Sequence, residues 1–200
     1  MEDKKQPLLK IPVEISLPKP EDRKFNNEIE EKPSRQLTTV DIKFGELNDK
    51  NLEQFRILNY VNLPVIYSEN FYKYLTSYTR YSKLAYIKDV LVGAISCKEH
   101  KEDGDKAVYI MTITVLKPYR RYGIGSKLLE KATEDCAKSR SINKMMLHVQ
   151  KGNDSALEFY KKNGFIIQEE LKDYYTDLTP ADCFILVKHI EWANSIIITI

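Results

Sequence analysis

VYIMTITVLKPYRRYGIGSKLL, residues 108–129, is the stretch that best predicts the fold. It begins with the β-branched and aromatic residues typical of a strand, turns near Pro118, and continues with the apolar periodicity of a helix. Gly123 and Gly125 lie where the turn becomes the helix. The first N–H groups of a helix have no intrahelical partner, and the helix dipole favours an anion there. The stretch therefore predicts a phosphate site.

The loop is basic, and a pyrophosphate or a 3′-phosphate would use the charges of Lys117, Arg120 and Arg121. It is not a P-loop, because no Gly-Lys-Ser/Thr closes it, and it lacks the third glycine of the dinucleotide-binding fingerprint. The spacing by itself therefore predicts only a ligand that carries phosphate.

Length and composition indicate one soluble globular domain. The chain has 200 residues, of which 42% are hydrophobic and 30% are charged. The net charge of +2 is too small to argue for nucleic acid or a membrane surface. Residues 196–200 are too few to span a bilayer, and the N-terminus lacks a signal peptide's apolar region. Cys97, Cys136 and Cys183 lack metal-ligand spacing, so we expect core residues in a reducing compartment rather than nucleophiles.

The chain divides into three parts. Residues 1–36 carry five prolines and many charges, which predicts an extended or disordered tail, with a docking role for residues 8–13 as the alternative. Residues 37–190 form the predicted domain, and residues 191–200 a C-terminal tail.

Within the domain, the patterns predict an α/β (mixed α+β) fold: a mixed, mostly antiparallel central sheet flanked by helices, with one parallel crossover through the phosphate-binding helix. The strands are expected at 37–44, 81–88, 90–100, from 108, 144–150, 165–175 and 183–190, and the helices from 48 to before Pro64, at 69–75, to about 140, and from 153 to 163. Residues 101–106 are expected as a polar turn.

Arg120-Arg121-Tyr122-Gly123-Ile124-Gly125, directly after an apolar strand, resembles the Arg/Gln-x-x-Gly-x-Gly/Ala signature of acetyl-CoA-dependent N-acetyltransferases, the GNAT superfamily. Further stretches, over residues 37–189, resemble one branch of it, the N-alpha-acetyltransferase 50 family, also called San, the catalytic subunit of the NatE complex. They are Leu63-Pro64-Val65-x-Tyr67, Leu84-Ala85-Tyr86, Val92-Gly93-Ala94, Tyr109-Ile110-Met111-Thr112, Leu147-His148-Val149-Gln150, Asn153-x-Ser155-Ala156-x-x-Phe159-Tyr160, Gly164-Phe165 and Tyr174-Tyr175.

The resemblance implies a GNAT fold, acetyl-CoA as acetyl donor and no metal. It also implies transfer to the α-amino group of protein N-terminal peptides, with a preference for an initiator Met followed by a hydrophobic residue. Members of the family can acetylate lysine side chains as well. The implied partners are a NatA-type auxiliary subunit and a sister catalytic subunit at the ribosome, with neither direct nucleic-acid contact nor a membrane span. The implied location is cytoplasmic, with a nuclear pool as the alternative.

The reaction needs a neutral amine. An α-amino group has a pKa of about 7.7–8, against roughly 10.4 for lysine, so a modest base suffices at a peptide N-terminus. The resemblance assigns that work to Tyr109 and His148, acting through an ordered water. Their strands should be neighbours, as sequential β-α-β elements usually are. A histidine in an apolar strand is otherwise a satisfied core residue, and that alternative stays open for His148.

The resemblance places Tyr160 near the CoA sulfur, where it could protonate or hydrogen-bond the leaving thiolate; an ordinary helix-face aromatic is the alternative. It implies that Asn153 contacts the pantetheine arm as well as capping a helix. It also implies that the backbone of Ile113–Val115 contacts pantetheine, that backbone N–H groups near Ile113 form an oxyanion hole, and that the basic loop binds the pyrophosphate. The implied acetyl-CoA residues are Ile113, Thr114, Val115, Arg120, Arg121, Tyr122, Gly123, Ile124, Gly125, Ser126, Lys127, Asn153 and Tyr160.

Two loops match those that grip the substrate peptide. Pro64 and Val65 with Met111 would form an apolar pocket for Met, and the tyrosines would bond the peptide backbone, although strand packing alone would also suit Tyr174 and Tyr175. The implied substrate residues are Leu63, Pro64, Val65, Tyr67, Met111, Tyr174, Tyr175 and Leu178. The chain departs from the family at three points: Leu63 replaces an aromatic residue usual in animal members, Thr176-Asp177 stands where basic residues are common, and Leu178 replaces a usual isoleucine. These differences put the preference for substrate side chains beyond position two in doubt.

Two other functions compete with N-terminal acetylation. A lysine or polyamine acetyltransferase is one, but a polyamine enzyme should have an acidic groove, and these loops are largely apolar. A non-catalytic subunit that binds acetyl-CoA and scaffolds a complex is the other. Loss of Tyr109, His148 or the loop glycines would favour the scaffold, and all of them are present.

Overall fold

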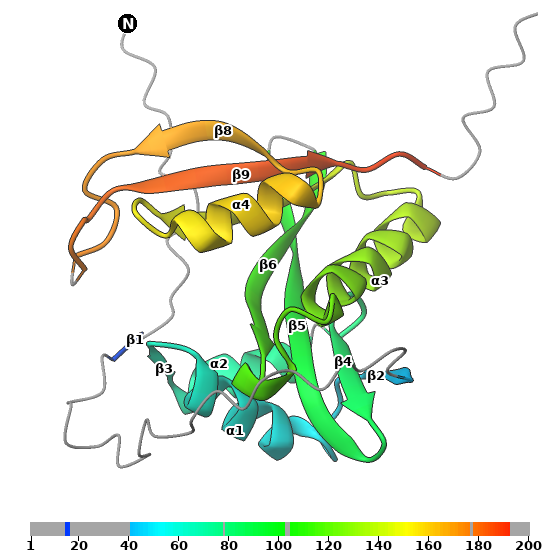
Figure 1. Ribbon diagram of the computed structural model, residues 1–200. Coiled ribbons are helices and arrows are strands. Elements are labelled where there is room, and N and C mark those ends of the chain that lie inside the picture. The colour runs from blue at the N-terminus through cyan, green and yellow to red at the C-terminus, as the bar shows by residue number, and fades with distance from the viewer. Residues whose placement is uncertain (1–14, 17–40, 78, 103–104, 177, 193–200) are drawn as a thin grey trace, which may run out of the picture.

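The computed structural model describes residues 15–16, 41–77, 79–102, 105–176 and 178–192. Within them, seven strands form one sheet in the order β2-β4-β5-β6-β7-β9-β8 (Figure 1). Only the β6–β7 pair in this sheet is parallel, which confirms the mixed, mostly antiparallel sheet and the single parallel crossover. The strands are β2 (Ile42–Glu46), β4 (Lys83–Ile87), β5 (Val90–Glu102), β6 (Asp105–Val115), β7 (Lys144–Gln150), β8 (Ile166–Leu171) and β9 (Cys183–His189). A separate two-stranded sheet pairs β1 (Ile15–Ser16) with β3 (Ile66–Tyr67).

Helices cover both faces of the sheet (Figure 1). Successive residues of β4 show why: Leu84 belongs to the core beneath α1 and α2, whereas Ala85 belongs to the larger core beneath α3 and α4. Side chains alternate along a strand, so one sheet serves two apolar cores. The helices are α1 (Leu52–Asn62), α2 (Glu69–Thr76), α3 (Ile124–Ser139) and α4 (Asp154–Lys162), with a short 3₁₀ turn, η2, at Lys117–Tyr119.

Several predicted boundaries were wrong by a few residues. The first helix begins at Leu52 rather than at Asn48, because the side chains of Asn48 and Asn51 hydrogen-bond to nearby backbone N–H groups and hold a turn there. Asn51 Oδ1 accepts from Asn48 N at 2.8 Å, and Asn48 Oδ1 accepts from Lys50 N at 2.9 Å. The strand expected at 37–44 is β2 at Ile42–Glu46, and residues 37–40 lie outside the described residues.

The hairpin before the phosphate loop is longer than expected. Lys101 pairs with Lys106 and Glu102 with Asp105, so the ladder occupies most of the predicted polar turn. The opposite holds at the last hairpin: β8 ends at Leu171, and the chain from Lys172 to Tyr175 leaves the sheet. That early end places Tyr174 and Tyr175 in a loop. The predicted docking role of residues 8–13 and most of both predicted tails lie outside the described residues.

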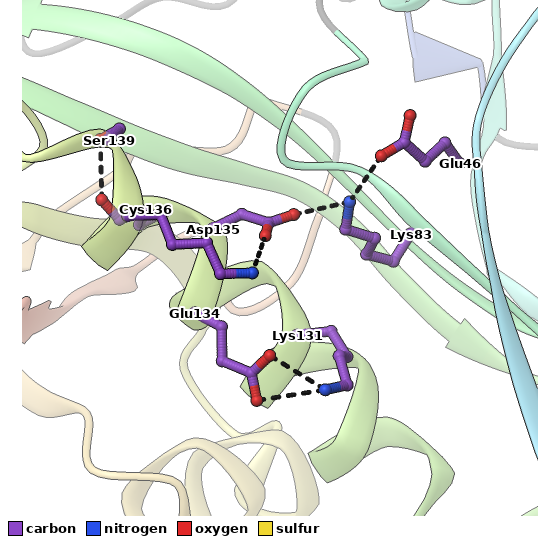
Figure 2. Close-up of polar contacts among 8 residues, drawn as sticks. Glu46, Lys83, Lys131, Glu134, Asp135, Cys136 and Ser139 are labelled. Atoms are coloured by element: carbon purple, nitrogen blue, oxygen red, sulfur yellow. Dashed lines mark hydrogen bonds and ion pairs between the residues drawn. The ribbon is translucent and has the colours of Figure 1, made fainter. Parts of the chain in front are cut away.

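A buried lysine ties α3 to the edge of the sheet (Figure 2). Lys83 on β4 is 8% exposed, and its Nζ lies 2.6 Å from Asp135 Oδ2 on α3 and 3.4 Å from Glu46 Oε1 on β2. Burial alone would raise the pKa of Asp135, but its ion pairs with Lys83 and Lys138 hold that pKa below its usual value. Removing the Asp135 carboxylate would leave the buried Lys83 charge with only the longer contact to the exposed Glu46, which is costly.

The three cysteines are buried in the described core, as expected. Burial raises the pKa of the Cys136 and Cys183 thiols to about 12, which makes them poor nucleophiles. Among the described residues we find no cluster of three or more His, Cys, Asp or Glu side chains that could hold a metal ion. None of the described helices is long and apolar enough to cross a membrane.

Candidate active site

The site begins where β6 and β7 part. Their parallel pairing extends from Ala107 with Lys144 to Tyr109 with Met146, the last pair of the register. On its other side, β6 carries a bulge: Ser96 pairs with Thr112 and Cys97 with Ile110, so Met111 is the extra residue. A bulge bends its strand, and this one follows directly after the last β6–β7 pair. The strands diverge there and line a cavity of about 1570 Å³.

One end of the cavity is the basic loop. Gly123 adopts a left-handed conformation, with φ of 75°, at the N-cap of α3, and no side chain caps that helix. Arg121 is also left-handed, with φ of 69°. Lys127 N bonds Gly123 O, which leaves the N–H groups of the first helical turn without an intrahelical acceptor. Gly123, Ile124, Gly125 and Ser126 all line the cavity, so these N–H groups suit an anion.

Arg120 spans the mouth of this loop. Its Nε donates to Val115 O at 3.0 Å, and its Nη2 to Asn62 Oδ1 at 3.5 Å, so it joins the end of β6 to the end of α1. Gly125 lies against α4: a Cβ added there would come within 3.3 Å of the Phe159 ring. A larger residue there would have to displace the Phe159 ring slightly, so the glycine favours close packing of α3 against α4.

Tyr109 and His148 meet in the middle of the cavity. The Tyr109 hydroxyl lies 2.9 Å from His148 Nδ1, and both side chains line the cavity. Tyr174 stacks on the imidazole, with ring centroids 4.6 Å apart and planes at 14°. The Nε2 atom of His148 is buried and lacks a hydrogen-bond partner among the described residues. The histidine is thus held by one tyrosine and covered by another.

Burial sets the ionisation of this pair. Desolvation lowers the pKa of His148 from 6.5 to about 4, so the imidazole is neutral at neutral pH. Burial also raises the pKa of Tyr109 well above its usual value, so the phenol keeps its proton. The site therefore holds a neutral phenol hydrogen-bonded to a neutral imidazole.

Tyr160 lies on the α4 side of the cavity. It is 6% exposed and packs edge-on against Phe159 and Phe165, with ring centroids 5.1 and 5.4 Å away. Burial raises its pKa, so its hydroxyl is protonated at neutral pH. Asn153 begins α4, and its Oδ1 accepts from Ala156 N at 3.2 Å, which confirms the predicted cap.

The opposite end of the cavity is apolar and aromatic. It is formed by the segment before α2, by the bulged residue of β6 and by the loop after β8. Tyr67 stacks on Phe71 of α2 at 4.2 Å and 23°, and burial raises its pKa to about 12. The predicted substrate residues all line this cavity: Leu63, Pro64, Val65, Tyr67, Met111, Tyr174, Tyr175 and Leu178.

Comparisons with known proteins agree with this geometry. Residues 48–165 match the acetyltransferase (GNAT) family. N-alpha-acetyltransferase 50 of Danio rerio is 41% identical over 150 residues, which cover 75% of this chain and 89% of that protein. The probable N-acetyltransferase san of Drosophila melanogaster is 38% identical over 152 residues, covering 76% and 83%.

The chain belongs to the N-alpha-acetyltransferase 50 family of GNAT enzymes. A solved structure of Arabidopsis thaliana Naa50 in complex with the bisubstrate analogue CoA-Ac-MVNAL is 42% identical, with a TM-score of 0.68, and covers 74% of this chain and 99% of that one. The GNAT fold inferred from the basic loop is therefore confirmed, as is the family.

In this N-alpha-acetyltransferase 50 family member, most residues predicted for acetyl-CoA line the cavity: Ile113, Thr114, Val115, Arg120, Arg121, Gly123, Ile124, Gly125, Ser126, Asn153 and Tyr160. Tyr122 and Lys127 are not among the described lining residues. Tyr122 packs against the larger core, and Lys127 is an exposed residue of α3. The family resemblance assigned both residues to the pyrophosphate loop, and that assignment stays a prediction.

Sequence reasoning missed several lining residues. Phe71, Phe159 and Gln150 line the cavity, and so do Glu169 and Lys172 at its rim. Gln150 Nε2 donates to Pro180 O at 2.8 Å, which joins β7 to the loop before β9. Phe71 stacks on Tyr67 and Phe159 packs edge-on against Tyr160, so both phenylalanines accompany predicted site tyrosines, but the positions of Glu169 and Lys172 depend on where β8 ends. Asp177, predicted to change the charge at the mouth, lies outside the described residues.

Proposed function

We propose that this enzyme transfers acetyl from acetyl-CoA to the α-amino group of peptides that begin with Met followed by a hydrophobic residue. The observation that carries the proposal is the Tyr109–His148 hydrogen bond of 2.9 Å, located between an anion-binding loop and an apolar, aromatic pocket. Acetyl-CoA, a substrate of the reaction, supplies the acetyl thioester when bound.

In this proposal the Tyr109–His148 pair removes the amine proton through a water. A phenol that keeps its proton can receive a hydrogen bond on its oxygen while donating its own to the imidazole. As the amine attacks, its proton passes through the water to the Tyr109 oxygen, and the proton of the Tyr109 hydroxyl passes to His148 Nδ1. A neutral imidazole is required for this, and burial keeps His148 neutral.

The residues of the anion loop fit the donor. The uncapped N-terminus of α3 offers backbone N–H groups to a pyrophosphate, and Arg120 and Arg121 add charge beside them. We assign to Tyr160 a hydrogen bond to the leaving thiolate, because its buried phenol keeps its proton and lines the cavity. Asn153 and the Ile113–Val115 segment line the cavity between these two points.

The acceptor pocket favours an apolar first side chain. Pro64, Val65 and Met111 offer apolar atoms, and the tyrosines around them carry hydroxyl groups for a peptide backbone. The relative solved with CoA-Ac-MVNAL holds a peptide that begins with Met and Val, which supports the same preference here.

Lysine acetylation by this chain remains a prediction. Deprotonating a lysine near neutral pH costs more than deprotonating an α-amine by roughly 2.5 pKa units, or about 3.4 kcal/mol. We therefore expect lysine transfer to be the slower reaction.

The test is acetyl transfer to a Met-Leu peptide, against the same peptide with a blocked N-terminus and an internal lysine. We expect activity on the free N-terminus, and a loss of about 10²–10⁴-fold in kcat for Tyr109→Phe and His148→Ala. Tyr60→Phe and His189→Ala serve as matched controls, since both residues are exposed and neither is among the described lining residues.

Activity confined to the blocked peptide would replace the proposal with a lysine acetyltransferase. Binding of acetyl-CoA without transfer to either peptide would favour the scaffold. The NatA-type auxiliary and catalytic partners and the cytoplasmic or nuclear location stay predictions of the family resemblance.

A further inference from the structure

A short strand from the N-terminal region pairs with the substrate loop. In β1, Ile15 pairs with Tyr67 and Ser16 with Ile66, in antiparallel register. Figure 1 shows β1 beside β3, away from the seven-stranded sheet. The surrounding sequence, Val13-Glu14-Ile15-Ser16-Leu17, alternates apolar and polar residues as strands do. This segment also lies outside residues 48–165, the part that matches the acetyltransferase family.

The strand that β1 meets is part of the acceptor pocket. Tyr67 lines the cavity and stacks on Phe71, while its backbone belongs to the pair with β1. β3 is not a member of the large sheet, and among the described residues β1 is its strand partner. An unpartnered strand presents backbone N–H and C=O groups that accept an extended chain. Tyr67 thus faces the cavity with its side chain and the N-terminal segment with its backbone.

We propose that the segment at Ile15–Ser16 is an intramolecular docking strand that fixes β3 and thereby raises the affinity for the peptide substrate. Two residues of ladder would bind weakly between separate molecules. Because the segment belongs to the same chain, docking is intramolecular, and tethering of this kind provides an effective concentration on the order of millimolar. Docking itself does not depend on the reaction; its effect on substrate affinity rests on the function proposed above.

Hydrogen exchange tests the docking without any substrate. The full chain is compared with a chain lacking residues 1–36 and with Ile15→Pro/Ser16→Pro, because proline has no N–H to donate to a ladder. Asn26→Pro/Asn27→Pro is the matched control, with the same substitutions elsewhere in the N-terminal region. We expect the amides at Ile66–Tyr67 to exchange at least several-fold faster in the truncated and Ile15/Ser16 chains. Unchanged exchange would overturn the docking.

Steady-state kinetics on the same four proteins tests the positioning. We expect the KM for a Met-Leu peptide to rise several-fold when the strand is removed, with the KM for acetyl-CoA unchanged, and we expect a synthetic peptide of residues 10–22 to restore it. An unchanged peptide KM would overturn the role, and a lower one would show that the segment competes with substrate. If no peptide is acetylated by any of the four chains, the proposed function fails while the exchange result still decides docking.

Discussion

Replacing His148 with glutamine should make the folding stability of the protein less sensitive to acid. Burial lowers the pKa of His148 from 6.5 to about 4, so the native state resists a proton that the unfolded chain accepts readily. A group whose pKa is depressed on folding contributes stability that is fully present above its unfolded value and is lost as the pH falls toward its folded value. The window for His148 therefore runs from about pH 6.5 down to about pH 4.

The size of the effect follows from the two pKa values. Between pH 7.5 and pH 5 the unfolded histidine becomes protonated while the folded one stays almost neutral, which lowers the free energy of unfolding by about 2 kcal/mol. The ring keeps some contact with solvent, so this figure is an upper estimate. Other groups titrate in the same range, and only the difference between wild type and variant isolates His148.

The assay is urea unfolding of wild type, His148→Gln and His189→Gln at both pH values. His189 is an exposed residue at the end of β9, which makes it the matched control. We expect wild type and the control to lose about 2 kcal/mol more than His148→Gln on going to pH 5. Equal losses in all three proteins would refute the assignment of a buried, neutral imidazole at this site.

Four further substitutions test the fold. Gly123→Ala should cost roughly 1–2 kcal/mol of stability, because φ is 75° there; a Cβ would meet no atom within 4 Å, so the cost comes from the backbone conformation alone. The same strain at the N-cap of α3 should weaken acetyl-CoA binding. Thermal unfolding and calorimetric titration measure the two effects. Asp135→Ala should cost about 2–3 kcal/mol in urea unfolding, because buried Lys83 loses its shorter ion pair and keeps only the exposed Glu46, whereas Lys83→Met should be close to neutral; the reverse order would contradict the ion-pair account. Ser68→Ala should cost about 1 kcal/mol, because Ser68 Oγ accepts from Phe71 N at the start of α2, and an unchanged unfolding midpoint would show that the cap contributes nothing.

The sequence predicted the parts of the site that depend on local pattern. The glycines where the turn becomes the phosphate-binding helix, Asn153 as a side-chain cap and the adjacency of the strands carrying Tyr109 and His148 all follow from short-range rules. Tyr174 over His148 was a different matter. Its place depends on β8 ending at Leu171, which is decided by tertiary pairing rather than by the sequence of the strand itself.

The cavity itself also could not be predicted from the sequence. It exists because the β6–β7 ladder stops at Tyr109 and Met146, and because the bulge at Met111 bends β6 immediately afterwards. A bulge is a one-residue mismatch between two strands, and neither strand's pattern alone reveals it. The sequence could therefore name the residues on both sides of the site but not the opening between them.

The electrostatics of the pair and the chemistry of the amine lead to one view of selectivity. A histidine whose pKa is about 4 is a weak base, so it accepts a proton only as the amine becomes acidic during attack. Near neutral pH an α-amine already has a substantial neutral fraction, whereas lysine has roughly 300-fold less for a pKa about 2.5 units higher. A strong base would narrow that difference, but a buried, neutral Tyr109–His148 pair leaves it in place. In the mechanism proposed above, the burial that weakens His148 as a base is therefore also expected to favour α-amines over lysine side chains.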